Sequence, residues 1–331
     1  MKKKIIFALL GLLIIILIVV TGYKLAKINT NNELTKIKVA EVTHSAFYAP
    51  LYIAIEKGYF KDNGLEVELI LTPGADKVSA AVLSNDVEIG FAGAESAIYI
   101  YEGGEKDYLQ IFSGLTKRDG QFILSREKND AFTLEDLKDK EILVGRASGM
   151  PAINFLNALK KENINPDELN INYSVEFAAL SGSFIGGMGD YVNLFEPTAT
   201  AVSKEGYGHI VANIGQLSGE VPYTTFYARK SYINNNEEVI NKFTKAITEG
   251  LEYTHNHSSK EIAEAILPQF SSISLDDLTT IVDNYKKADS WYQDTVVPEQ
   301  SFINLEDMLK DNDLLEDYVP YKDLVKNYSH E

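Results

Sequence analysis

The chain has 331 residues, no cysteine, 45% hydrophobic residues and a formal net charge of −17 at pH 7. Its length and composition are those of a folded globular protein with two domains, which excludes a disordered or collagen-like chain. The lack of cysteine excludes disulfides, thiolate metal sites, a cysteine nucleophile and a lipid-modified cysteine, and the acidic balance argues against nucleic acid as a partner.

The N-terminal segment is basic and then apolar. Lysines at positions 2–4 precede an uninterrupted apolar run from Ile5 to Val20. With the three residues that follow, this run is long enough to cross about 30 Å of hydrocarbon, so residues 1–27 are predicted to be an uncleaved membrane anchor. The alternatives are a cleaved signal peptide and a buried core helix. The lysines are expected in the cytoplasm and the body outside the cell membrane, secreted or periplasmic if the signal is cleaved. Residues 28–36 are predicted to be a flexible tether.

The body alternates short strands with helices in two cycles and then becomes helical. The first cycle predicts strands at 37–42, 65–71, 88–92, 109–115 and 121–125 and helices at 50–61, 75–84 and 94–101. The second predicts strands at 142–145, 171–175, 191–195, 209–214 and 224–228 and helices at 133–137, 150–162, 178–185 and 198–205. Helices with apolar stripes follow at 236–255, 260–267, 275–287 and 298–310. This pattern predicts an α/β protein with two lobes, the helical tail packing on one of them.

Motifs for catalysis are missing from the sequence. Neither a phosphate-binding Gly-x-x-x-x-Gly-Lys-Ser/Thr loop nor a Gly-x-Gly-x-x-Gly fingerprint occurs. No Ser-His-Asp spacing or nucleophile elbow is visible. His255 and His257 are expected to complement a helix C-terminus rather than to bind a metal. The sequence therefore predicts no catalytic residue, no metal site and no cofactor.

Three strand-to-helix junctions carry residues suited to a ligand cleft, at 43–50, 90–96 and 145–151. In the first, loop aromatic residues can stack on a flat ligand, or they can simply pack at the helix start. In the second, small residues expose backbone N–H groups to an anion, or Glu95 itself complements the helix dipole. In the third, Ser148 is the expected N-cap. Because open α/β sheets bind ligands beyond the carboxyl ends of their strands, the three junctions are expected to meet in one crevice.

The stretch from Phe47 to Val67, FYAPLYIAIEKGYFKDNGLEV, resembles the opening of the SsuA/THI5-like (NMT1) family of ABC-importer solute-binding proteins. Segments 86–93, 194–198 and 220–224 are similar to later family segments and occur in the expected order. The resemblance spans residues 37 to 315.

This resemblance implies the type II periplasmic-binding-protein fold, in which two crossing strands join two lobes that close over a ligand. The crossings are expected near 121–125 and 224–228. One lobe would then comprise residues 37–119 plus 229–331, and the other residues 120–228. The implied partners are a small-molecule solute, an ABC permease and its ATPase.

Family members differ in ligand: aliphatic sulfonates, taurine, nitrate, thiamine pyrimidine precursors and riboflavin-like molecules. Near the expected crevice this chain has carboxylates, which accept hydrogen bonds from amino or ring N–H groups, and aromatic side chains with flat faces. These features favour an amino-bearing heteroaromatic ligand, with an aliphatic sulfonate as the next choice. The predicted ligand-binding residues are His44, Phe47, Tyr48, Glu95, Ser96, Ser148, Gly149, Met150, Asp190, Glu196, Tyr223 and Thr224.

Two other functions share this fold. The eukaryotic THI5 proteins are enzymes that make the thiamine pyrimidine, and the resemblance implies for them a Cys-rich iron motif and a histidine in the first helix-start loop. This chain has no cysteine, and Tyr48 stands at that histidine position while His44 lies upstream, so no enzyme is expected. A sensory ectodomain on the same fold is the other alternative.

Overall fold

The computed structural model describes residues 34–328. The predicted membrane anchor and most of the predicted tether lie outside these residues, and both stay predictions. Among residues 34–328, none of the helices combines the length and the apolar character needed to cross a membrane.

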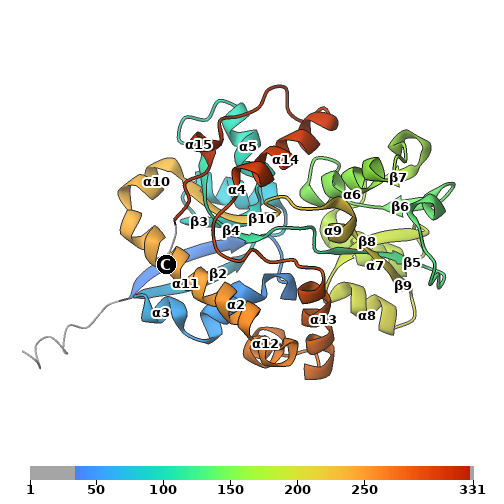
Figure 1. The fold of residues 1–331 in the computed structure, drawn as a ribbon, viewed down its shortest axis with the longest axis horizontal. Helices are drawn as coiled ribbons and strands as arrows, with labels where there is room; N and C mark the ends of the chain where they lie inside the picture. Colours follow the sequence, from blue (N-terminus) through green and yellow to red (C-terminus); the bar gives the residue numbers. More distant parts are fainter. Residues whose placement is uncertain (1–33, 329–331) are drawn as a thin grey trace, which may run out of the picture. The chain divides into compact units, whose positions relative to one another are not determined.

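The first sheet has five strands in the order β2-β1-β3-β10-β4 (Figure 1). Its strands are β1 (Thr35–Glu41), β2 (Leu65–Leu71), β3 (Ile89–Gly93), β4 (Leu109–Thr116) and β10 (Thr224–Arg229). The first three strands run parallel, and β10 runs antiparallel to both of its neighbours. Strand β1 begins inside the predicted tether, because the Thr35 N–H donates to the Gly64 carbonyl and Thr35 pairs with Leu65.

The second sheet also has five strands, in the order β7-β6-β8-β5-β9. Its strands are β5 (Gln121–Ser125), β6 (Glu141–Leu143), β7 (Asn170–Asn172), β8 (Tyr191–Phe195) and β9 (His209–Asn213). Strand β6 is shorter than predicted, because Gly145 adopts a φ of 91° and turns the chain toward the next helix. A φ in this range favours glycine, which has no Cβ to clash.

Helices cover both sheets. Those along the first sheet are η1 (Ala46–Tyr48), α2 (Ala49–Glu56), α3 (Tyr59–Asp62), α4 (Ala75–Leu83), α5 (Glu95–Glu102), α10 (Lys230–Asn235) and α11 (Glu237–Asn256). Those along the second are η2 (Leu134–Leu137), α6 (Met150–Lys161), η3 (Pro166–Glu168), η4 (Phe177–Ala179), α7 (Leu180–Ile185), α8 (Thr198–Lys204) and α9 (Ile214–Ser218). The predicted helix at 50–61 is two helices, because Gly58 at a φ of 81° separates α2 from α3.

The chain crosses between the two sheets at residues 117–120 and again at 219–223. The crossings are neighbours: the Val221 N–H donates to the Lys117 carbonyl and the Tyr223 N–H to the Thr116 carbonyl, both at 3.0 Å. The predicted second lobe wrongly included 224–228, since these residues form β10, which pairs on both sides within the first sheet. We therefore propose a first lobe built on the first sheet and a second lobe of residues 121–218.

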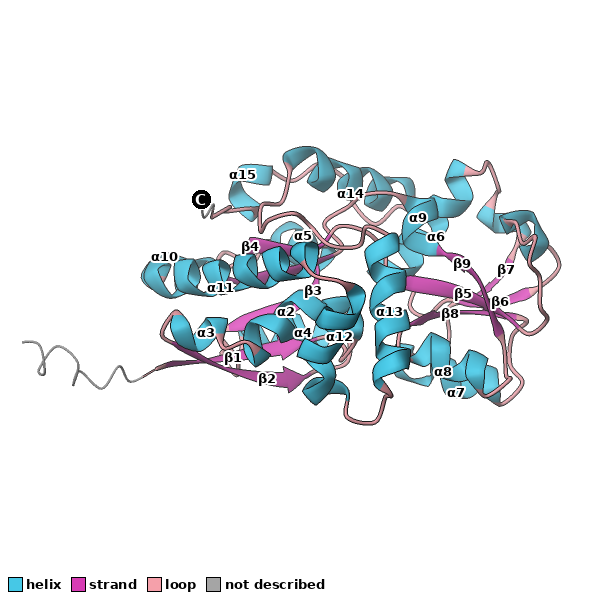
Figure 2. Cartoon of the chain, turned by 60° about the horizontal axis from the view of Figure 1, so that its bottom comes forward, coloured by secondary structure: helices cyan, strands magenta, loops and turns pink. Residues whose placement is uncertain are grey.

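The C-terminal helices contact both lobes, whereas the sequence predicted that they pack on only one lobe. They are α12 (Ser259–Ile266), η5 (Leu267–Phe270), α13 (Leu275–Lys287), α14 (Glu299–Asp311) and α15 (Tyr321–Leu324). Figure 2 shows α13 between the strands of the two sheets. Asp277 on α13 pairs with Lys204, and Asp311 on α14 pairs with Lys160. Helices α13 and α14 therefore also contact the second lobe through these two ion pairs.

Helices α2 and α11 pack closely at Gly250. A Cβ added at Gly250 would lie 2.2 Å from the Pro50 carbonyl oxygen, so the backbones would have to separate. We expect Gly250→Ala to lower the free energy of unfolding by about 1–3 kcal/mol in urea denaturation. Gly182→Ala on α7 is the matched control, because an added Cβ there meets nothing within 4 Å. Equal stability of the two variants would contradict the close packing.

Candidate functional site

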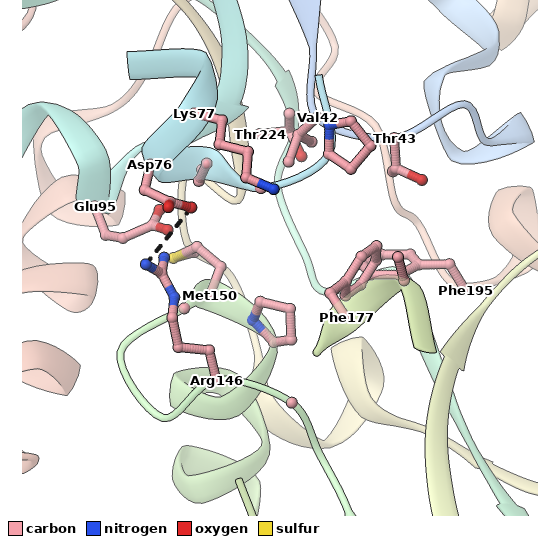
Figure 3. A pocket seen from close by; sticks show the side chains of 18 of the residues that line it. Val42, Thr43, Asp76, Lys77, Glu95, Arg146, Met150, Phe177, Phe195 and Thr224 are labelled. Carbon is pink, nitrogen blue, oxygen red and sulfur yellow. Dashed lines mark ion pairs between the residues drawn. The ribbon is translucent and has the colours of Figure 1, made fainter. Parts of the chain in front are cut away.

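A cavity of about 440 Å³, here called the main cavity, lies between the lobes (Figure 3). The first lobe contributes the ends of β1 and β3, the loop before α4 and the start of α5. The second lobe contributes the segment 144–151, the loop around η4 and the end of β8. The cavity thus lies beyond the carboxyl ends of parallel strands, where open α/β sheets bind ligands.

All three predicted junctions reach the main cavity. The predicted residues that line it are Tyr48, Glu95, Gly149, Met150, Tyr223 and Thr224. These six come from η1, α5, α6 and the return crossing with β10, so segments far apart in the sequence converge as expected. Their contact with a ligand stays a prediction.

Phe47 does not line the main cavity and instead packs beneath it. Its side chain is fully buried, with the rings of Tyr285, Tyr48 and Tyr223 centred 5.1, 5.5 and 5.8 Å away. Its carbonyl accepts a hydrogen bond of 2.8 Å from the Trp291 indole. Of the two roles open to this aromatic residue, the structure shows packing at the helix start.

Three further predicted residues, Ser96, Ser148 and Asp190, do not line the main cavity. Ser96 is buried on α5, and the Ser148 carbonyl accepts a 3.1 Å hydrogen bond from the Tyr99 hydroxyl. The N-cap of α6 is Gly149 rather than Ser148. Asp190 accepts a 2.9 Å hydrogen bond from the Glu141 N–H and so joins the starts of β6 and β8.

His44 and Glu196 line a second cavity of about 260 Å³, the side cavity, which shares Thr43, Phe177 and Phe195 with the main cavity. The His44 ring nitrogens lie 2.9 Å from Glu41 Oε1 and 3.0 Å from the Gln269 carbonyl. Hydrogen bonding to Glu41 raises the pKa of His44.

The Glu196 carboxylate is engaged by α8. It accepts hydrogen bonds of 2.8 and 2.7 Å from the N–H and hydroxyl of Thr200. Burial raises the pKa of Glu196, and these hydrogen bonds partly offset the rise. Both carboxylate oxygens therefore accept hydrogen bonds from α8, so Glu196 has a structural role at the edge of the side cavity.

Glu95 is the buried charge of the main cavity. Its side chain is 1% exposed, and within the described part of the chain its Oε2 has no hydrogen-bond partner. Burial raises the pKa of Glu95 to about 7, partly offset by the backbone N–H groups of α5 and Met150 and by the charge of Arg146. The carboxyl thus occupies the start of α5 and offers a free acceptor oxygen in an apolar setting.

Asp76 and Lys77 line the main cavity but were missed by the sequence prediction, whereas Arg146 lies within the predicted junction at 145–151. Arg146 of the second lobe lies 3.7 Å from Asp76 of the first, and Figure 3 shows its guanidinium reaching toward Asp76 and Glu95. Lys77 extends toward the same space. Asp76 and Lys77 follow a predicted strand at a helix start, so the junction argument would have found them. Phe177 lies in a 3-10 turn that carries no recognisable motif.

Tyr48 and Tyr223 are aromatic residues that line the main cavity. Burial raises the pKa of both hydroxyls, so both stay protonated and able to donate. Hydrogen bonding with Thr224 partly offsets the rise at Tyr48. With Phe177 and Phe195 they give the cavity an aromatic lining that suits a flat molecule.

Comparison with known proteins agrees with this architecture. The profile of the "NMT1/THI5 like" family matches residues 46–261. YtlA of Bacillus subtilis (strain 168), a candidate binding protein by its name, is 41% identical over 304 residues, covering 92% of this chain and 91% of the relative. The nitrate import ATP-binding protein NrtC of Synechocystis (strain PCC 6803) is 24% identical over 68% of this chain and 36% of its own length.

Solved structures share the fold. The alkanesulfonate-binding protein SsuA from Xanthomonas axonopodis pv. citri, bound to MOPS, superposes with a TM-score of 0.71 at 15% identity, covering 89% of this chain and 99% of that chain. At this identity the likeness establishes the fold alone. The predicted α/β periplasmic-binding-protein fold with two sheets is therefore confirmed.

Proposed function

The chain belongs to the NMT1/THI5-like family, and on this premise we propose that it is the extracytoplasmic solute-binding component of an ABC importer. Its proposed ligand is a small heteroaromatic molecule with an amino group, such as a thiamine pyrimidine precursor. The proposed partners are a permease and its ATPase, which the similarity to an import ATP-binding protein supports. The N-terminal segment would hold the protein at the membrane.

Glu95 carries the proposal for the ligand. A buried carboxylate oxygen without a partner is unfavourable, and a ligand N–H group would satisfy it. Because Glu95 already occupies the start of α5, its negative charge also disfavours an anion at that helix. The aromatic lining adds stacking surface for a ring. An amino group on a flat ring matches both features.

An aliphatic sulfonate is the second candidate, because Lys77 extends toward the main cavity and could meet an anionic group. Arg146 adds less to this candidate, since it faces Asp76 and Glu95.

Isothermal titration of the full-length protein tests the proposal. The ligands are the hydroxymethyl aminopyrimidine precursor of thiamine (the pyrimidine probe), riboflavin, taurine and nitrate. We expect saturable heat with the pyrimidine probe and none with taurine or nitrate. Binding of taurine alone would support the sulfonate candidate. No binding of any of the four would contradict the proposed ligand class.

A further inference from the structure

A second buried acid lies behind the main cavity, on the outgoing crossing. Asp119 is 0% exposed, and its Oδ1 accepts a 2.6 Å hydrogen bond from the Gln121 N–H. Its Oδ2 has no partner among residues 34–328, and the same holds for the hydroxyl of Tyr223, which is 3% exposed on the return crossing. Tyr223 lines the main cavity and Asp119 does not. Two buried polar groups without partners call for a role, because leaving them unpaired is unfavourable.

The fold holds Asp119 and Tyr223 next to each other. The crossings are hydrogen-bonded to one another through the Val221 N–H and the Lys117 carbonyl, and the Tyr223 N–H donates to the Thr116 carbonyl at the end of β4. Helix α9 packs directly on the Asp119 backbone, since a Cβ at Gly215 would lie 2.1 Å from the Asp119 carbonyl oxygen. The Tyr223 hydroxyl is close enough to offset part of the effect of burial on the pKa of Asp119.

Basic neighbours do not neutralise Asp119. Lys117 and Arg118, on the same crossing, lie 2.8 and 3.5 Å from Asp289 instead. The groups that interact electrostatically with the pair are Tyr48 from η1 and Glu95 from α5. Burial therefore raises the pKa of Asp119 to about 8, which leaves the carboxyl largely protonated at neutral pH.

We propose that Asp119 is a positioning residue that sets the direction of the hydrogen bond between Tyr223 and the ligand. A protonated carboxyl donates to the Tyr223 oxygen, so that the phenol O–H points into the cavity and donates to the ligand. An ionised carboxylate accepts the phenol proton, and the Tyr223 oxygen then faces the ligand as an acceptor.

This inference rests on the proposed function and refines its ligand. With Asp119 protonated, Tyr223 offers a donor and Glu95 an acceptor in one cavity. An aminopyrimidine presents the complementary pair, a ring nitrogen that accepts and an amino group that donates. The site would therefore distinguish this ligand from rings that carry only donors or only acceptors.

Ligand titration across pH tests the hydrogen-bond direction. For the wild type, we expect the affinity for the pyrimidine probe to fall about tenfold as the pH rises through about 8, since ionised Asp119 turns the donor away. Asp119→Asn keeps a neutral donor at the same place, so it should retain the neutral-pH affinity and lose this fall. Tyr223→Phe should bind more weakly at neutral pH and also lose it. A fall that persists in Asp119→Asn would overturn the inference.

Infrared spectroscopy tests the pair without a ligand. The background is Glu95→Gln, which removes the buried acid that lines the main cavity. We expect the carbonyl stretch of a protonated carboxylic acid that disappears as the pH passes about 8, is missing in Asp119→Asn and shifts in Tyr223→Phe. A band that Tyr223→Phe leaves unshifted would overturn the pairing. A shifted band in a protein that binds no pyrimidine would contradict the proposed ligand alone.

Discussion

Glu95→Gln is expected to lower the affinity for the pyrimidine probe by about 10- to 100-fold, measured by titration slightly above pH 7. The amide keeps the size of the carboxyl but loses its charge, and a hydrogen bond from an amino group to a charged acceptor is the stronger kind. In the wild type, affinity should also fall as the pH drops through about 7, because protonation removes the charge. Glutamine should abolish this dependence.

The free energy of unfolding of Glu95→Gln is the control for the expected loss of affinity. The pKa of Glu95 is raised from 4.5 to about 7, so the folded protein keeps a proton that the unfolded chain loses across this window. Glu95 therefore contributes fully to the free energy of unfolding below about pH 4.5. This contribution, on the order of 3 kcal/mol, is lost as the pH rises to 7. Glu95→Gln should be at least as stable as the wild type above pH 7. Glu162→Gln, on an exposed residue, should change neither property.

Phe47→Ala is expected to lower the free energy of unfolding by about 3–5 kcal/mol in urea denaturation. The fully buried ring supports Tyr48 and Tyr223 and is packed against Tyr285, so its removal leaves a cavity beneath the site. Phe177→Ala is the matched comparison, because this ring is only partly buried and lines the main cavity. It should weaken binding with a smaller loss of stability. The reverse pattern would show that Phe47 contacts the ligand.

The neighbours Phe47 and Tyr48 show how far sequence reasoning reaches. The junction pattern placed both at a helix start beyond a strand, which was right. Which ring faces the cavity depends on the 3-10 turn of η1 and on distant partners. Phe47 faces Gly120, where an added Cβ would lie 2.7 Å from its ring, and Trp291 holds its carbonyl. No local pattern contains these contacts.

The same limit explains the errors in the domain boundaries and the charged residues. The residues of the 224–228 segment predict a strand. The sheet to which this strand belongs is set by its pairing with Phe91 and Ser113, which lie far away in the chain. Asp76 looks like a solvated surface residue in the sequence, and it interacts with Arg146 only because the two lobes meet. The hydrophobic periodicity of the sequence therefore predicts helices, strands and the ends of strands better than it predicts contacts between residues far apart in the chain.

The place of β10 in the first sheet has a consequence for biosynthesis. This strand separates β3 from β4, so the first sheet stays incomplete until the ribosome has translated residues 224–229. The second sheet needs nothing beyond Asn213. During translation the second lobe can thus fold first, while β3 and β4 lack the strand that lies between them in the complete first sheet.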